Sequence, residues 1–111
     1  MPKPLFRGVG ASSVTPFRPD ASLDLDRLGP HLDWLIQERV DAISPLGSSG
    51  EFVAMECDDR KRVLAAAISK IAGRVHVVAG THDYSTRRTQ ELSQFAEAEG
   101  ADSLLIVPPY Y

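Results

Sequence analysis

One short run, Gly47-Ser48-Ser49-Gly50-Glu51, holds the residue types in this sequence that are best suited to chemistry. Glycine lets the backbone turn its N–H groups toward a ligand, and the hydroxyls of Ser48 and Ser49 can rotate to donate to a carboxylate or a phosphate. The run therefore predicts a binding site for a small acid, with Gly47 and Gly50 shaping the turn. The alternative is a plain loop or linker, which has the same composition.

The run lies between a segment with strand character and a segment with helix character. Four apolar, strand-like segments occur at residues 9–14, 42–46, 75–79 and 103–107. They are spaced by roughly one βα unit of about 30 residues, with a helix-period segment in each gap. The pattern predicts a βαβαβαβ order in which the run follows the second strand.

Three amphipathic helices are expected between these strands. The first carries a stripe of leucines but contains Gly29-Pro30, so either it is kinked there or its main part begins with Pro30 in the first turn. The second covers residues 56–71 and ends before Gly73, and the third begins after Ser85 as N-cap and ends before Gly100.

The strand segments are too apolar to be half exposed, which favours a parallel sheet covered on both sides or closed into a barrel. The 111 residues are 43% hydrophobic with a formal charge of −3, which fits one domain over residues 1–111 with no internal boundary. No basic excess points to nucleic acid, and no apolar run approaches the roughly 20 residues of a membrane span. The sequence shows no signal peptide, so we expect a cytoplasmic protein that binds neither nucleic acid nor a membrane.

The remaining polar candidates also follow predicted strands. Carboxyl ends of parallel strands meet on one face, where ligands of α/β proteins bind, so three loops are expected to converge there. They contribute Ser48, Ser49 and Glu51, then Thr81, His82 and Asp83, then the run Pro108-Pro109-Tyr110-Tyr111.

Structural roles compete with function at several of these positions. Glu51 is expected to brace its loop through its carboxylate, Tyr110 to pack or to function, and His76 to be packed within its strand. His31 is expected on a helix surface, and His82 is left open between the two roles. No histidine has a second ligand at metal-binding spacing, so no metal site is expected.

Five strings in order resemble the amino-terminal half of the dihydrodipicolinate synthase and N-acetylneuraminate lyase family, from about Gly8 to the end of the chain. They are Val14-Thr-Pro-Phe17, Gly47-Ser-Ser-Gly-Glu51, Arg60-Lys-Arg-Val63, Val78-Ala-Gly-Thr81, and Gly100-Ala-Asp102 through Val107-Pro-Pro-Tyr-Tyr111. The resemblance implies a (β/α)8 barrel, of the α/β class, with this chain covering about the first four βα units. Two serines stand where dihydrodipicolinate synthases usually have threonines, which leaves the subfamily open.

The resemblance also implies a class I aldolase or lyase that joins pyruvate, a 2-oxo acid, to a lysine as a Schiff base, with no metal and no cofactor. Ser49 would bind the pyruvate carboxylate, Ser48 would link a proton relay, and Tyr111 would join the relay of a neighbouring subunit. A homo-oligomer, dimer or tetramer, is therefore expected of the complete protein.

The family's lysine and relay tyrosine lie beyond Tyr111, and none of Lys3, Lys61 and Lys70 matches the lysine position. We therefore expect these 111 residues alone to be inactive. Three interpretations stay open: the front part of a dihydrodipicolinate synthase, the front part of a neuraminate lyase or of an aldolase or dehydratase for 2-oxo-3-deoxy sugar acids, and a non-catalytic half-barrel.

Overall fold

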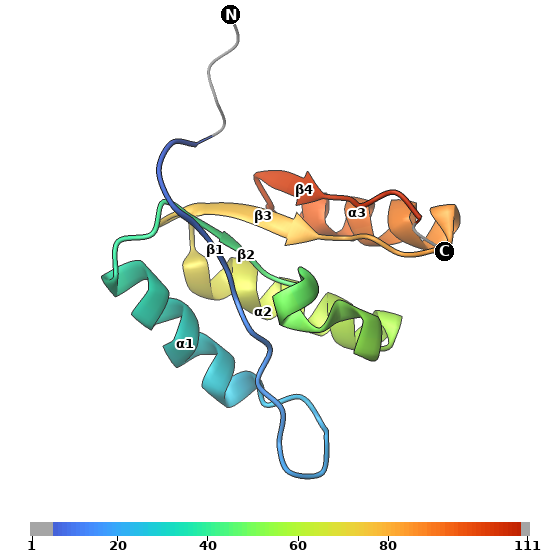
Figure 1. Cartoon of the computed structure of the whole chain (residues 1–111), viewed down its shortest axis with the longest axis horizontal. Coiled ribbons are helices and arrows are strands. Elements are labelled where there is room, and N and C mark those ends of the chain that lie inside the picture. Colours follow the sequence, from blue (N-terminus) through green and yellow to red (C-terminus); the bar gives the residue numbers. More distant parts are fainter. Residues whose placement is uncertain (1–5, 110–111) are drawn as a thin grey trace, which may run out of the picture.

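The computed structural model describes residues 6–109, in which strands and helices alternate along the chain (Figure 1). These residues form four strands, three α-helices and two short 3-10 helices. The elements are β1 (Gly10–Ser12), α1 (Leu25–Gln37), β2 (Ala42–Ser44), η1 (Ser48–Gly50), η2 (Phe52–Ala54), α2 (Cys57–Ile71), β3 (His76–Gly80), α3 (Thr86–Glu99) and β4 (Ser103–Leu105).

The strands form one parallel sheet in the order β1-β2-β3-β4. Neighbours in sequence are neighbours in the sheet, as in a (β/α)8 barrel, whereas a doubly wound sheet reverses its strand order. The helices follow the same order, because α2 packs against both α1 and α3. The predicted α/β class is confirmed, and the four predicted strands alternate with the three predicted helices, although β1, β2 and β4 are shorter than the apolar segments that predicted them.

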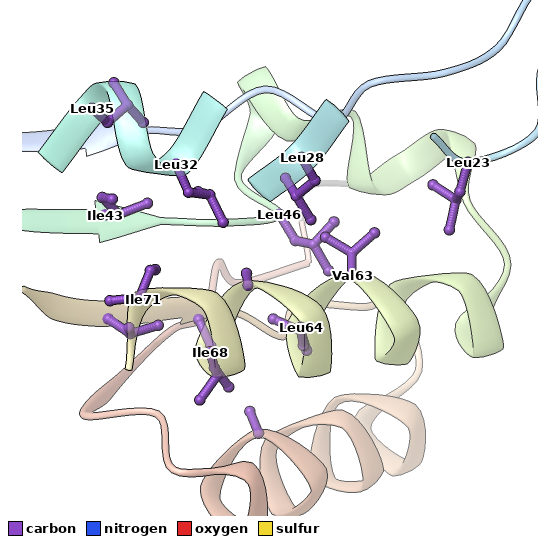
Figure 2. Packing of buried hydrophobic residues seen from close by; sticks show 14 residues of the cluster. Leu23, Leu28, Leu32, Leu35, Ile43, Leu46, Val63, Leu64, Ile68 and Ile71 are labelled. Carbon is purple, nitrogen blue, oxygen red and sulfur yellow. The ribbon is translucent and has the colours of Figure 1, made fainter. Parts of the chain in front are cut away.

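The hydrophobic core lies between the helices and one face of the sheet. Ile43 of β2 and Val77 of β3 pair in register and point into this layer, where they are almost fully buried. Figure 2 shows Leu32 and Leu35 of α1 on one side of Ile43, with Ile71 of α2 on the other. Because side chains alternate across a strand, this packing turns the intervening residues toward the opposite, inner face of the sheet.

The first helix differs from one of the two expectations. It is a single element from Leu25 to Gln37 with Pro30 inside it, so the alternative in which the main helix begins at Pro30 is wrong. The Asp24 side chain accepts a hydrogen bond from the Arg27 N–H and so fixes the start of the helix one turn before the proline. Gly29 has no Cβ, which removes part of the clash between a proline and the residue before it.

The ends of the other helices follow the predicted signals closely. The Ser85 hydroxyl accepts from the Arg88 N–H at the start of α3, and Gly100 ends that helix with φ 104°. Helix α2 ends at Ile71 as expected, and Ala72, just before Gly73, takes the left-handed conformation that ends it. Among the described helices, none combines the length and the apolar character needed to cross a membrane.

His31 is expected on a helix surface, but its side chain is partly buried and contacts a neighbouring segment. Its Nε2 accepts a hydrogen bond from the Val14 N–H at 3.3 Å, and its ring stacks on Trp34 with centroids 6.1 Å apart. Partial burial lowers the pKa of His31, which favours the neutral form that can accept this bond. The helix α1 is thereby joined to the chain that leaves β1.

The close approach of β3 to the end of β2 requires a glycine at position 80. The Gly80 N–H donates to the Pro45 carbonyl at 2.9 Å, and a Cβ on Gly80 would lie 2.0 Å from the Leu46 carbonyl oxygen. That distance is well inside van der Waals contact, and the obstacle is backbone, so an added methyl group must push the two strand ends apart.

We therefore expect Gly80→Ala to lower the free energy of unfolding by about 1–3 kcal/mol or more. Gly10→Ala, in β1, is the matched control, because its Cβ would meet only side-chain carbons of Phe6 and Ala42 at 3.5 to 3.8 Å, which are ordinary van der Waals distances. That change should leave stability unchanged or raise it by up to about 1 kcal/mol. Urea denaturation followed by circular dichroism measures both, and equal effects would contradict the close approach.

Candidate ligand site at the carboxyl ends of the strands

The predicted acid-binding run forms a tight turn at the carboxyl end of β2. Residues Ser48–Gly50 make a single 3-10 turn, in which the N–H groups of Gly50 and Glu51 donate to the carbonyls of Gly47 and Ser48, each at 3.0 Å. These bonds leave the N–H groups of Ser48 and Ser49 outside the turn's own hydrogen bonding. Ser48 and Ser49 are exposed while Gly47 and Gly50 are buried, so the hydroxyls face outward from a fixed backbone.

A buried threonine that follows the first strand holds this turn in place. The Thr15 hydroxyl donates to the Gly50 carbonyl at 2.7 Å, and the Thr15 side chain is only 7% exposed. Residues 15 and 50 come from different βα units, so this bond joins the exit of β1 to the exit of β2. A Cβ on Gly50 would also lie 3.3 Å from the Ser13 carbonyl, which leaves little room for a larger residue.

The turn also contacts the inner face of the sheet on both sides. A Cβ on Gly47 would lie 3.8 Å from Leu105 of β4 and 3.9 Å from the Ser12 hydroxyl oxygen of β1. The exits of β1, β2 and β4 therefore meet around this turn. Together they form a shallow, partly polar surface in which Ser12, Ser48 and Ser49 are exposed.

The second predicted loop, residues 81–83, serves as scaffold. Thr81 is fully buried and its hydroxyl pairs with that of Ser93 on α3 at 2.9 Å. The Asp83 carboxylate accepts from the Ser85 N–H at 2.9 Å and from Arg60 at 3.2 Å. Both side chains are thus engaged with α2, with α3 or with the start of α3.

The cation that holds this loop is Arg60, a nearly fully buried residue of α2. Its guanidinium forms an ion pair with Asp83, donates to the His82 carbonyl and lies 5.3 Å from the centre of the Phe52 ring. Burial lowers the pKa of Arg60, and the Asp83 charge acts in the opposite direction. Through its two terminal nitrogens, which bond Asp83 and the His82 carbonyl, Arg60 ties α2 to the β3–α3 loop.

Three further candidates are placed by their contacts. His82 is 4% exposed and its ring lies edge-on to Phe52 and Tyr84, with centroids 5.6 and 5.8 Å away. His76 is packed as expected, with its Nε2 2.9 Å from the Ser103 hydroxyl. Glu51 is exposed, and its backbone carbonyl accepts from the Ala54 N–H, so the loop is braced through its main chain.

The third predicted loop is described only up to Pro109. Residues 106–109 and the β3–α3 side of the molecule line a hollow of about 250 Å³, which includes Asp83 and Thr89. Tyr110 and Tyr111 lie outside the described residues, so the expected role of Tyr111 stays a prediction. Within residues 6–109 no group of three or more histidine, cysteine or acidic side chains is arranged to hold a metal ion.

Sequence reasoning missed three residues that build this site. Thr15 and Gly80 stand inside motif strings, but their contacts across strands have no local signal. The burial of Arg60 could have been suspected from the motif that follows the acidic start of α2, yet a charged residue on a helix is usually exposed.

A parallel sheet with sequential strand order and a ligand face at its carboxyl edge defines a protein of the βα-barrel class. Comparison with known proteins narrows this class. The model of the Dihydrodipicolinate synthetase family matches residues 5–111, and the chain belongs to that family.

Known relatives and structures agree with the family. The chain is 41% identical over 107 residues to a 4-hydroxy-tetrahydrodipicolinate synthase of Pelobacter propionicus and 39% identical over 111 residues to that of Acetivibrio thermocellus. These matches cover 96% and 100% of this chain but only 37% and 38% of the relatives. YagE, an E. coli prophage protein of the dihydrodipicolinic acid synthase family solved in complex with pyruvate, superposes with a TM-score of 0.94 at 38% identity. That superposition covers 97% of this chain and 36% of YagE.

Removing the Thr15 hydroxyl tests how the turn is held. Thr15→Val keeps the shape of the side chain but leaves the buried Gly50 carbonyl without its donor, so we expect a loss of about 1–3 kcal/mol in unfolding free energy. Thr15→Ser keeps the hydroxyl, loses one methyl group and should cost about 1 kcal/mol or less. Urea unfolding of both variants gives the comparison, and a serine variant as unstable as the valine variant would argue against the hydrogen bond.

Proposed function

We propose that the chain provides the carboxylate-binding end of a class I lyase or aldolase that acts on pyruvate or a related 2-oxo acid. A 4-hydroxy-tetrahydrodipicolinate synthase is the simplest form of this proposal. The observation that carries it is the fixed turn with two exposed hydroxyls, Ser48 and Ser49, at the carboxyl edge of the sheet. The pyruvate complex of YagE, which superposes over 97% of this chain, supports the choice of ligand.

Each residue of the turn has a role in this proposal. The Ser49 hydroxyl and N–H donate to the pyruvate carboxylate, because neither group is used to close the turn. Ser48 passes a proton to and from the substrate through its hydroxyl. Gly47 and Gly50 let the backbone pack beneath these groups, and Tyr111 extends the relay of a neighbouring subunit in a dimer or tetramer.

The Schiff base itself needs a lysine in addition to these residues. Its amine attacks the ketone carbon of pyruvate and water leaves. The protonated imine then accepts the electron pair of the C–H or C–C bond that breaks at the next carbon, and the resulting enamine donates that pair when a new bond forms there. Lys61 and Lys70 are unsuited, because both lie on α2 and are paired, with Glu91 and Asp33 respectively. The hydrogen bond to Glu91 raises the pKa of Lys61, which is opposite to what a nucleophilic amine needs.

A second candidate is an N-acetylneuraminate lyase, or an aldolase or dehydratase for 2-oxo-3-deoxy sugar acids. It is favoured by the serine pair, which stands where dihydrodipicolinate synthases usually have threonines. Both candidates hold the 2-oxo acid in the same way and differ in the second substrate. For both candidates we propose a cytoplasmic homo-oligomer. The third alternative is a half-barrel without catalytic activity.

Pyruvate binding to the 111-residue chain tests the carboxylate site directly. In a ¹⁵N-¹H NMR titration, pyruvate should shift the amide signals of residues 48–51, and Ser49→Ala should remove most of that shift. Ser69→Ala, a change at an exposed serine of α2, should leave the titration unchanged. Acetone, which has the ketone without the carboxylate, should cause no shift in residues 48–51. Shifts centred elsewhere, or unaffected by Ser49→Ala, would contradict the proposal.

The position of the nucleophile is tested by trapping. Borohydride reduces an imine to a stable amine, so intact mass reports any Schiff base formed between pyruvate and a lysine. We expect no adduct on these 111 residues, because Lys61 and Lys70 are held in ion pairs away from the turn. The Acetivibrio thermocellus synthase serves as positive control, and a pyruvate adduct on this chain would refute the expectation.

A further inference from the structure

The imidazole of His31 joins helix α1 to the chain that leaves β1. Its Nε2 accepts a hydrogen bond from the Val14 N–H at 3.3 Å, so this ring nitrogen carries no proton. The segment that follows β1 runs beside the first turns of α1 (Figure 1). Val14 immediately precedes Thr15, whose hydroxyl donates to the Gly50 carbonyl at 2.7 Å. Two consecutive residues therefore connect α1 to the serine turn.

A single proton can break this connection. A protonated imidazole has an N–H at both ring nitrogens and no acceptor, so Nε2 and the Val14 N–H would become two donors facing each other. The partly buried ring of His31 can turn toward water, because the Trp34 ring on which it stacks is 53% exposed. The Val14 N–H then bonds water, and α1 no longer holds the exit of β1.

Charged side chains near His31 are occupied with other partners. Residues 13–17, which contain the bonded N–H, include no acidic or basic side chain. On α1, Arg27 stands one turn earlier and pairs with Asp24 at 3.5 Å. The cations that α2 brings to α1 share one carboxylate, which lies on another side of the helix from His31: Lys70 and Arg74, paired with Asp33. Partial burial is therefore what lowers the pKa of His31 below its usual value of 6.5.

We propose that His31 is a pH-operated latch for the acid-binding turn. In its neutral form it holds Val14, and through Thr15 it keeps the serine turn in one geometry. In its protonated form it releases Val14, and the turn binds a carboxylate less tightly. His31 touches no ligand in this scheme, so it is a positioning residue. The latch rests on the proposed carboxylate site, to which it adds a dependence on pH.

A direct effect of charge would have the opposite sign. An imidazolium attracts an anion, so a protonated His31 acting through space would strengthen carboxylate binding. Release of Val14 weakens binding, because part of the binding free energy is then used to order the turn. The direction of the pH effect therefore distinguishes a latch from a nearby positive charge.

The latch itself is tested without a ligand. An NMR titration between about pH 8 and 5 follows the His31 ring and the backbone amides separately from His76 and His82. We expect the signals of His31, Val14 and Gly50 to move with one common midpoint, which lies below pH 6.5. A Val14 or Gly50 amide that does not follow the midpoint of His31 would overturn the latch.

Pyruvate binding at the two ends of this pH range measures the effect on the site. Pyruvate stays ionised throughout, so its own charge does not change. Its dissociation constant should rise about two- to fivefold on acidification, with the midpoint of His31, since one modest hydrogen bond is lost. Binding that is unchanged or tighter at low pH would overturn the latch alone. No binding at either pH would refute the proposed carboxylate site, and the latch with it.

Two variants at position 31 separate the hydrogen bond from the charge. His31→Gln offers an amide oxygen to the Val14 N–H and does not titrate, so it should keep the high-pH affinity at low pH. His31→Phe keeps a ring without an acceptor and should bind pyruvate about two- to fivefold more weakly at every pH. Circular dichroism checks that both are folded, and the titration of the unmodified chain decides if either is not. A glutamine variant that keeps the pH dependence, or a phenylalanine variant with full affinity, would contradict the proposal.

Discussion

The packing of three helices against one face of a parallel sheet is the constraint on which the rest of the structure depends. Ile43 and Val77 must point into the helix layer to be buried, which fixes the register of β2 and β3. A shift by one residue would move both side chains to the opposite face. With the register set, all four strands end on one side, and their loops meet there.

The converging loops divide into a scaffold and a ligand surface. Arg60 and Asp83 are paired to each other and to backbone groups, so their charges stabilise the β3–α3 loop. Truncating either partner would leave a buried charge, which costs far more than a surface pair contributes. Ser48 and Ser49 are exposed above a backbone that is fixed by the Thr15 bond to Gly50 and by the close approach of Gly80 to Leu46.

The sequential strand order agrees with the dihydrodipicolinate synthetase family, to which the chain belongs. Within residues 6–109 the same order leaves β1 and β4 as edge strands. The chain spans 36% to 38% of the length of the relatives that it matches, and it contains four strands in the described residues where a barrel has eight. Exposed apolar side chains, among them Val9 before β1 and Leu104 and Leu105 within β4, lie along the two edge strands of the described residues.

Local patterns in the sequence were enough to predict the order of elements and the position of the serine run after the second strand. The spacing of apolar segments, the Ser85 cap and the Gly100 stop predicted where strands and helices lie, since these signals act within a few residues. The serine run was recognised for the same reason, and the resemblance to a family supplied its expected roles. Contacts between distant residues were decided only by the tertiary structure: the Thr15 bond to Gly50, the approach of Gly80 to Leu46, and the burial of Arg60. Each joins different βα units, and no local pattern encodes which strand ends come together or which polar groups are enclosed when they do.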